Sequence, residues 1–300
     1  MNRARIASSS APGVPSSRTE LAMSTWELTS ILVFGSAGAG FLGSLTGLGG
    51  GIVVIPLLTI VLGVDIRYAI GASLVSVIAT SSGAAAAYVR EGFSNIRIGM
   101  FLEIATTLGA LGGAVIALHI GPSAIAVIFG LALLYSAAVA FRTRAAENRG
   151  VPPDKLATRL RMNGSFPTPQ GIRHYNVRNV PAGFGLMALA GVLSGLLGIG
   201  SGALKVIAMD RVMRMPFKVS TTTSNFMIGV TAAASAGVYL NRGYVDPVLA
   251  LPVMLGVLVG SLLGARLLAR ADTRTLRVVF AVAIMAVGIE MIVKGFTGRM

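Results

Sequence analysis

The sequence predicts an all-α polytopic membrane protein with glycine-broken helices and about 8–10 membrane segments, built from two sequence-repeated halves that we expect to be inverted. Only 12% of its 300 residues are charged, whereas ordinary soluble domains carry about 25%. Apolar residues make up 54% of the chain, and the mean hydropathy is +0.79. A water-soluble protein of this size cannot bury that much apolar surface, so the chain is expected in a bilayer.

The chain is strongly basic, with a formal net charge of +14. In a membrane protein such an excess is typical of cytoplasmic loops, and the basic residues lack the interleaved aromatic residues that bind nucleic acid. The chain has no cysteine and two histidines, which excludes disulfides and thiolate sites and disfavours a multi-histidine metal site. We therefore expect no metal, no cofactor and no nucleic-acid partner.

The first half begins after a polar tail. Residues 1–25 lack the apolar core of a signal peptide, and we expect them to be disordered. One helix over 28–62 would be roughly 52 Å long, whereas the hydrocarbon core is about 30 Å thick, so this stretch must break. The glycines of Gly47-Leu48-Gly49-Gly50-Gly51 mark the break. The first transmembrane repeat, 26–142, thus has apolar pieces at about 28–46, 50–62, 68–89, 98–119 and 122–141.

Residues 143–180 have a different composition. They are rich in arginine and proline and show no apolar periodicity, which predicts a basic, solvated cytoplasmic connector. The second transmembrane repeat, 181–294, resumes the apolar pattern at about 181–200, 202–209, 218–240, 245–269 and 275–293.

An offset of 151 residues aligns the two halves without gaps. It pairs Gly47 with Gly198 and Ser73 with Ser224, and it holds over roughly 100 residues. Coincidence among glycines is the alternative explanation, and one constant offset over such a length disfavours it. Internal repeats of this kind are typical of transporters.

The number of membrane crossings that the broken segment makes decides between two arrangements of the halves. If its two pieces cross separately, each half has five crossings and the halves are inverted; if they form one span, the halves are parallel. The inverted arrangement places nearly all Lys and Arg of the internal loops on the side of the connector, so it is favoured, although both termini then lie outside. A re-entrant hairpin, which we take to restore the parallel arrangement, remains an alternative.

The glycine breaks are candidate binding sites. Unwound backbone at membrane depth is tolerated where it is buried in protein or lines a polar cavity, and a helix that restarts there presents free N–H groups to an anion. Close packing of helices through small residues is the alternative, and two breaks at equivalent positions favour binding. The candidate residues are Gly47, Gly49, Gly50 and Gly51 in the first break, and Gly198, Gly200, Ser201 and Gly202 in the second.

Polar residues near the breaks complete the candidate site. Lys205 lies in apolar sequence, where an ammonium group needs an anion, a partner or a cavity; snorkelling toward the membrane surface is the alternative. Hydroxyl and amide groups suit a tetrahedral oxyanion, although capping and interhelical hydrogen bonds explain some of them. These residues are Ser73, Thr222, Thr223, Ser224 and Asn225.

Two carboxylates lie within predicted spans. Glu103 is a candidate proton-coupling group, because an ionisable residue inside the membrane is functional by default; a hydrated position near a segment end is the alternative. Glu290 lies near the end of its segment, where hydration is the simpler interpretation.

These motifs resemble the sulfite exporter TauE/SafE family of membrane permeases. The resemblance covers about residues 26–294. It rests on the first break with Pro56, on Gly71-Ala72-Ser73, on the run from Gly195 to Gly202 and on Thr223 to Val230. Three positions depart from the pattern. Ser201 stands where a third glycine is usual, Ile207 occupies the position equivalent to Pro56, and Val54 occupies the position equivalent to Lys205.

The resemblance implies a multi-pass permease of the bacterial inner membrane that exports a small sulfur-containing anion, sulfite or an organosulfonate. Alternating access around the two breaks is the expected mechanism, with a small inorganic or organic anion and the lipid bilayer as partners. A passive anion channel and a transporter of another small organic anion remain alternatives. The spans lack the paired carboxylates or Ser-His groups of an intramembrane enzyme, so we expect no enzyme.

Overall fold

The computed structural model describes residues 25–46, 50–90, 94–141, 154–168, 171–268 and 273–298. Within these ranges the chain forms eleven α-helices, two π-helical segments and one two-stranded hairpin. The helical bundle agrees with the predicted all-α class, whereas the hairpin was not predicted. The N-terminal tail and residues 47–49 of the first break lie outside the described residues.

The helices of the two halves have matching bounds. The first half contains α1 (Thr25–Thr46), α2 (Gly51–Pro56), η1 (Leu57–Val61), α3 (Ile66–Arg90), α4 (Ile96–His119) and α5 (Pro122–Phe141). The second contains α7 (Val180–Leu197), α8 (Gly202–Ile207), η2 (Ala208–Val212), α9 (Phe217–Asn241), α10 (Pro247–Leu268) and α11 (Thr273–Thr297). The bounds of α2, η1 and α3 precede those of α8, η2 and α9 by 151 residues, the offset seen in the sequence.

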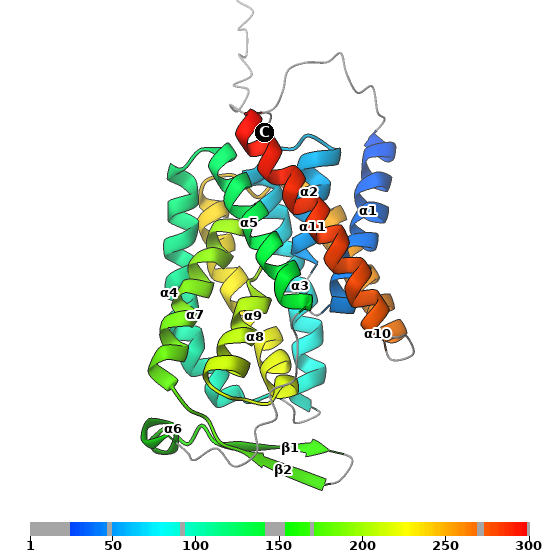
Figure 1. The fold of residues 1–300 in the computed structure, drawn as a ribbon. Coiled ribbons are helices and arrows are strands. Elements are labelled where there is room, and N and C mark those ends of the chain that lie inside the picture. The colour runs from blue at the N-terminus through cyan, green and yellow to red at the C-terminus, as the bar shows by residue number, and fades with distance from the viewer. Residues whose placement is uncertain are drawn as a thin grey trace, which may run out of the picture.

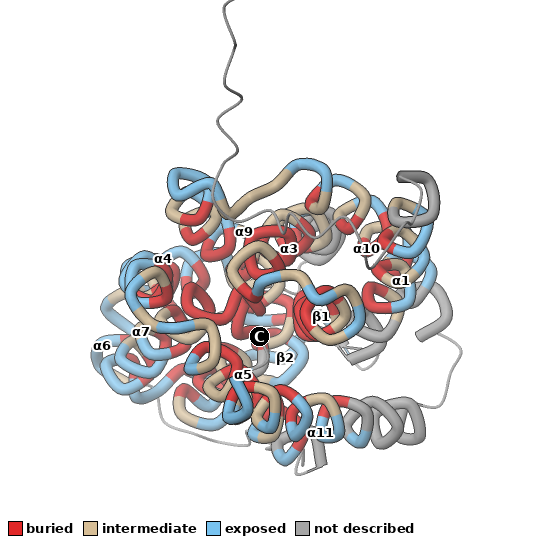
Figure 2. The backbone as a smooth tube through the Cα atoms, turned by 90° about the horizontal axis from the view of Figure 1, so that it is seen from above, coloured by how far each residue is buried: buried red, intermediate tan, exposed pale blue. Residues whose placement is uncertain are grey.

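Between the halves lie α6 (Lys155–Arg159) and a hairpin of β1 (Gly164–Thr168) and β2 (Gly171–Tyr175). The hairpin lies at one end of the bundle, which we call the hairpin end, and α11 ends at the opposite end (Figure 1). The two helix pairs α4–α7 and α1–α10 lie on either side of α3 and α9, with buried residues on their facing sides (Figure 2).

Each broken segment turns back inside the bundle. The segment formed by α1, α2 and η1 enters and leaves at the end where α11 ends, and there Lys294 Nζ contacts the Ile60 carbonyl oxygen at 3.4 Å. The segment formed by α7, α8 and η2 enters and leaves at the hairpin end, where Asn179 Nδ2 donates to the Val212 carbonyl oxygen at 3.2 Å. The expectation that the two pieces of each broken segment cross separately is therefore wrong, because both segments are hairpins.

The observed hairpins also correct the expectation that a re-entrant hairpin restores the parallel arrangement of the halves. A segment that returns to its own side adds no passage, which leaves three helices per half to be counted: α3, α4 and α5 in the first half, and α9, α10 and α11 in the second. Three passages are an odd number. A hairpin therefore does not restore the parallel arrangement.

Glycine lets the outer helix pairs approach closely. A Cβ atom on Gly109 of α4 would overlap the carbonyl oxygen of Ala188 in α7. A Cβ atom on Gly260 of α10 would overlap the carbonyl oxygen of Ala37 in α1, and this contact is related to the first by the 151-residue offset. Small residues at such interfaces are typical of membrane helix packing, where van der Waals contact drives association.

We expect Gly113→Ala to lower the free energy of unfolding by about 1–3 kcal/mol, because a Cβ atom there would overlap the Val192 carbonyl oxygen of α7. Gly112 is a matched control on the same helix, since a Cβ atom there meets no described atom within 4 Å. Thermal unfolding of the two purified variants in one detergent checks this, and equal losses of stability would contradict the packing.

The outer surface of the bundle is apolar. Met100, Ile104, Leu108, Leu111 and Val115 are exposed along α4, and their spacing of three or four residues places them on one stripe. Such a stripe fits lipid chains better than water. By length and hydropathy, α4 and α7 are each sufficient to cross a membrane, and other apolar helices are described over shorter stretches.

Residues 154–168 and 171–179 of the connector include α6 and the hairpin, elements that were not predicted from the sequence. Buried Met162, Tyr175 and Val177 pack against the hairpin end of the bundle. Asn95 Nδ2, just before α4, donates to the Tyr175 hydroxyl at 2.8 Å and to the Met162 carbonyl oxygen at 3.1 Å. Burial raises the pKa of Tyr175, against the opposing effect of the Asn95 hydrogen bond, so the phenol keeps its proton at neutral pH.

Candidate functional site

The two breaks meet inside the bundle. The Ser73 hydroxyl of α3 donates to the Gly198 carbonyl oxygen at 2.9 Å, so the first half contacts the second break directly. A Cβ atom on Gly51 would lie 2.5 Å from Ser73 Oγ and 3.2 Å from the Gly198 carbonyl oxygen. Gly51, Ser73 and Gly198, which the sequence predicts as site residues, are therefore neighbours, although they are far apart in the chain.

The second break is a run of left-handed backbone. Gly198, Gly200 and Ser201 have φ values of 66°, 71° and 44°. Gly198 ends α7 with the left-handed cap that glycine favours, and its N–H donates to the Ser194 carbonyl oxygen at 2.8 Å. Ser201 adopts this conformation without being glycine, and its buried hydroxyl has no partner among the described residues. A strained residue with an unsatisfied hydroxyl indicates a role beyond packing.

We expect Ser201→Gly to raise the free energy of unfolding by about 1 kcal/mol, because glycine adopts positive φ without the steric cost that Ser201 bears. Thermal unfolding of the variant and the wild type in one detergent checks this, and a variant of lower stability would contradict the strain.

The first break differs locally from the second. Gly50 has an ordinary right-handed φ of −64° and precedes α2, whereas Ser201, its counterpart, is left-handed. The candidate residues Gly47 and Gly49 lie outside the described residues. Pro56 is the last residue of α2, and the matching Ile207 is the last residue of α8.

A cavity of about 320 Å³ opens beside the second break, between α2, α5, α7 and α8. Its walls are mostly apolar, and Ser136, Ser201 and Gly202 supply polar groups. Small-molecule sites commonly have this character, with apolar walls and a few placed polar groups.

The hydroxyl cluster at the start of α9 separates into different environments. Ser224 Oγ donates to the Gly202 carbonyl oxygen at 3.3 Å, so it faces the second break. Thr223 Oγ1 accepts the backbone N–H of Asn95 at 3.0 Å and faces the hairpin end instead. Thr222 donates to carbonyl oxygens of its own helix, and Asn225 is half-buried on α9. Within this cluster, Ser224 is the side chain with a described contact to the break.

Lys205 is fully buried and does not line the cavity. Its Nζ donates to Thr231 Oγ1 of α9 at 2.5 Å, and Thr231 Oγ1 donates to Glu103 Oε1 of α4 at 2.6 Å. The structure thus brings Lys205 and Glu103 together through one hydroxyl, and Lys205 does not snorkel to the surface. Thr231 was not among the residues predicted for the site, although it lies seven residues after Ser224 and hence on the same face of α9.

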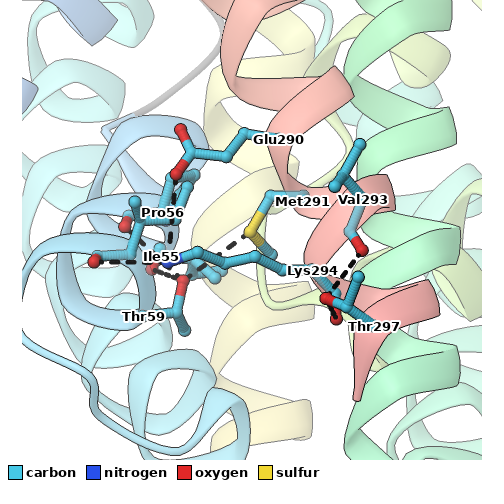
Figure 3. Close-up of polar contacts among 9 residues, drawn as sticks. Ile55, Pro56, Thr59, Glu290, Met291, Val293, Lys294 and Thr297 are labelled. Atoms are coloured by element: carbon cyan, nitrogen blue, oxygen red, sulfur yellow. Dashed lines mark hydrogen bonds and ion pairs between the residues drawn. The ribbon is translucent and has the colours of Figure 1, made fainter. Parts of the chain in front are cut away.

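Glu290 has the hydrated role expected from its position. Its carboxylate lies 3.9 Å from Lys294 one turn later on α11, and its side chain is half-exposed (Figure 3). Next to this pair, the Thr59 hydroxyl donates to the Ile55 carbonyl oxygen at 2.9 Å and contacts Met291 Sδ at 3.7 Å. These contacts hold α2 and η1 against α11.

Comparison with known proteins gives one family. The family model described as "Sulfite exporter TauE/SafE" matches residues 32–291. The probable membrane transporter protein YunE of Bacillus subtilis (strain 168) is 28% identical over 265 residues, which cover 86% of this chain and 94% of that protein.

A probable membrane transporter protein of Xylella fastidiosa (strain 9a5c) is 29% identical over 267 residues, covering 87% of this chain and 94% of that protein. YdhB of Bacillus subtilis (strain 168), also named a probable membrane transporter protein, is 28% identical over 231 residues, with 76% and 83% covered. No solved structure matches the chain.

Proposed function

Because the chain belongs to the sulfite exporter TauE/SafE family of membrane transporters, we propose that it is a permease that exports a small sulfur-containing anion, sulfite or an organosulfonate, by alternating access. The observation that carries the proposal is the meeting of the two helix breaks, where Ser73 donates to the Gly198 carbonyl oxygen. Irregular backbone at the centre of a membrane bundle is typical of substrate sites in transporters with internal repeats.

In this proposal the two halves are inverted repeats. The equal offset of the helix bounds, the offset-related contacts of Gly109 and Gly260, and the hairpins that open toward opposite ends all support it. Repeats with opposite orientation let one half rock against the other, which exposes a fixed site to each side in turn.

The hairpin end faces the cytoplasm in this proposal. Exposed basic side chains gather in the segments at that end, whereas the described segments at the opposite end carry fewer. The exposed basic residues of these segments are Arg97, Lys155, Arg159, Arg161, Arg173, Arg178, Arg211, Arg214 and Lys218. This orientation suits the bacterial inner membrane.

The anion binds between the two breaks in this proposal. A tetrahedral oxyanion needs donors from several directions. The Ser201 hydroxyl has no partner among the described residues and can donate directly, whereas Ser73 and Ser224 turn to the anion from the carbonyl oxygens of Gly198 and Gly202. Backbone N–H groups of the breaks add donors, and Lys205 provides the counter-charge once it is released from Thr231.

The test is uptake of labelled sulfite and a labelled small sulfonate into liposomes that contain the purified protein. We expect uptake by the wild type, strong losses in Lys205→Ala and in Ser224→Ala with Asn225→Ala, and a loss in Ser73→Ala. Ser82→Ala is a matched control, because this exposed serine of α3 donates to its own helix at the Ile78 carbonyl oxygen. Unchanged uptake in the Lys205 and Ser224/Asn225 variants would show that the site is wrongly placed, and no wild-type uptake would contradict the function.

A further inference from the structure

Three buried side chains form a chain of hydrogen bonds across the core. Lys205 of α8 donates to Thr231 of α9, and Thr231 donates to Glu103 of α4, at 2.5 Å and 2.6 Å. A hydroxyl that accepts from a cation and donates to a carboxylate links their charges and provides a route for a proton. Thr107 Oγ1 also donates to Glu103 Oε1, at 3.1 Å.

The second carboxylate oxygen of Glu103 is unsatisfied. Glu103 is 7% exposed, and its Oε2 atom has no hydrogen-bond partner among the described residues. An ionised carboxylate with one bare buried oxygen is costly, and a proton on that oxygen removes the charge that causes the cost. The geometry therefore presents an acceptor for a proton at Oε2, while Oε1 keeps its two donors.

The surrounding elements leave these two charges facing each other. The helices packed against this region are α4, α7, α8 and α9, with η2 following α8. Over its described length α7 carries no ionisable side chain, and the others carry theirs near the helix ends. The ionisable residues of those elements besides Lys205 and Glu103 are Arg97, His119, Asp210, Arg211, Lys218 and Tyr239.

We propose that Glu103 is a proton-binding site that competes with the transported anion for Lys205, so that one proton moves with each singly charged anion. This inference rests on the proposed function and deepens it. In the anion-free state the Glu103 carboxylate balances Lys205 through Thr231. A proton binds Glu103 Oε2, Lys205 is then left without a counter-charge, and its ammonium group turns to the anion at the break.

Charge balance explains why the two events are coupled. With Glu103 ionised and no anion bound, the pair has no net charge. With Glu103 protonated and one anion beside Lys205, the net charge is again zero. Each of the other two combinations buries an uncompensated charge, which a membrane interior strongly disfavours. The carrier therefore changes sides only when it holds both the proton and the anion, or neither.

The experiment measures uptake of labelled methanesulfonate by reconstituted protein, because a sulfonate keeps one negative charge over the accessible pH range. For the wild type we expect roughly tenfold accumulation per pH unit toward the alkaline side, and no dependence on an imposed potential. For Glu103→Gln we expect no response to the pH gradient and no net accumulation, because the empty variant carries an uncompensated Lys205 charge and therefore only exchanges one anion for another. Thr231→Val should slow the pH-driven uptake, and Thr231→Ser should restore it.

Glu290→Gln is the matched control, since this carboxylate is half-exposed and paired with Lys294 away from the chain; it should retain the wild-type responses. Wild-type uptake that follows the potential and ignores the pH gradient would overturn the proton site and leave the proposed function intact. Absence of wild-type uptake of both methanesulfonate and sulfite would overturn the proposed function itself. If Glu103→Gln does not fold, the wild-type comparison of the pH gradient with the potential decides the question.

Discussion

Lys205→Met alone should lower the free energy of unfolding by about 3–5 kcal/mol at neutral pH, because it leaves the buried Glu103 carboxylate without its counter-charge. The double variant Lys205→Met with Glu103→Gln should recover most of that loss. It removes both charges together, and a buried ion pair replaced as a unit is often neutral in stability. The measurement is chemical or thermal unfolding of the two single variants and the double variant in one detergent, analysed as a double-mutant cycle.

A coupling energy near zero would contradict the linked pair. In that outcome the double variant loses the sum of the two single losses, and Thr231 does not connect the charges. Lys294→Met with Glu290→Gln is the control cycle, because that surface pair is half-exposed and is expected to couple by less than about 1 kcal/mol.

Gly51→Ala should remove most transport, whereas Gly202→Ala, at the equivalent position of the second half, should retain much of it. A methyl group on Gly51 would displace Ser73 Oγ and press on the Gly198 carbonyl oxygen, so it separates the two breaks. A methyl group on Gly202 meets the far end of the Ile228 side chain at 2.8 Å, and that end can rotate away. Initial uptake rates, normalised to folded protein in the liposomes, give the comparison.

Equal losses at the two glycines would mean that contact between the breaks is not what transport requires. A stronger loss at Gly202 would place the site nearer Ile228 and α9. In either case, size-exclusion profiles of both variants establish that the protein compared is folded.

The sequence was sufficient to place the breaks, because they follow from length. An apolar stretch too long for the membrane must be interrupted, and its glycines show where. The sequence was insufficient to decide between a crossing and a hairpin. Loop charges indicate the side on which a loop lies, but the glycine loop at 47–51 carries no charge to count.

The hydrogen-bond chain from Lys205 to Glu103 was predictable from the sequence only in part. Each residue was recognised singly as a charge that needs a partner, and both are buried. Their pairing depends on how α4, α8 and α9 meet, and Thr231 looks like any other threonine in a membrane helix. The packing of the connector against the bundle was missed for a related reason. Its few buried apolar residues, such as Met162 and Val177, are scattered among many basic ones and form no recognisable pattern.

Counterflow tests the central claim, transport by a site that alternates between the two sides, most directly. Liposomes that contain the purified protein are loaded with unlabelled sulfite or sulfonate and diluted into a trace of the labelled anion. We expect a transient accumulation of label above its equilibrium level, with an exchange rate that saturates as the unlabelled anion increases. Label that enters without an overshoot, at a rate that rises linearly with concentration, would indicate a passive channel and contradict the account.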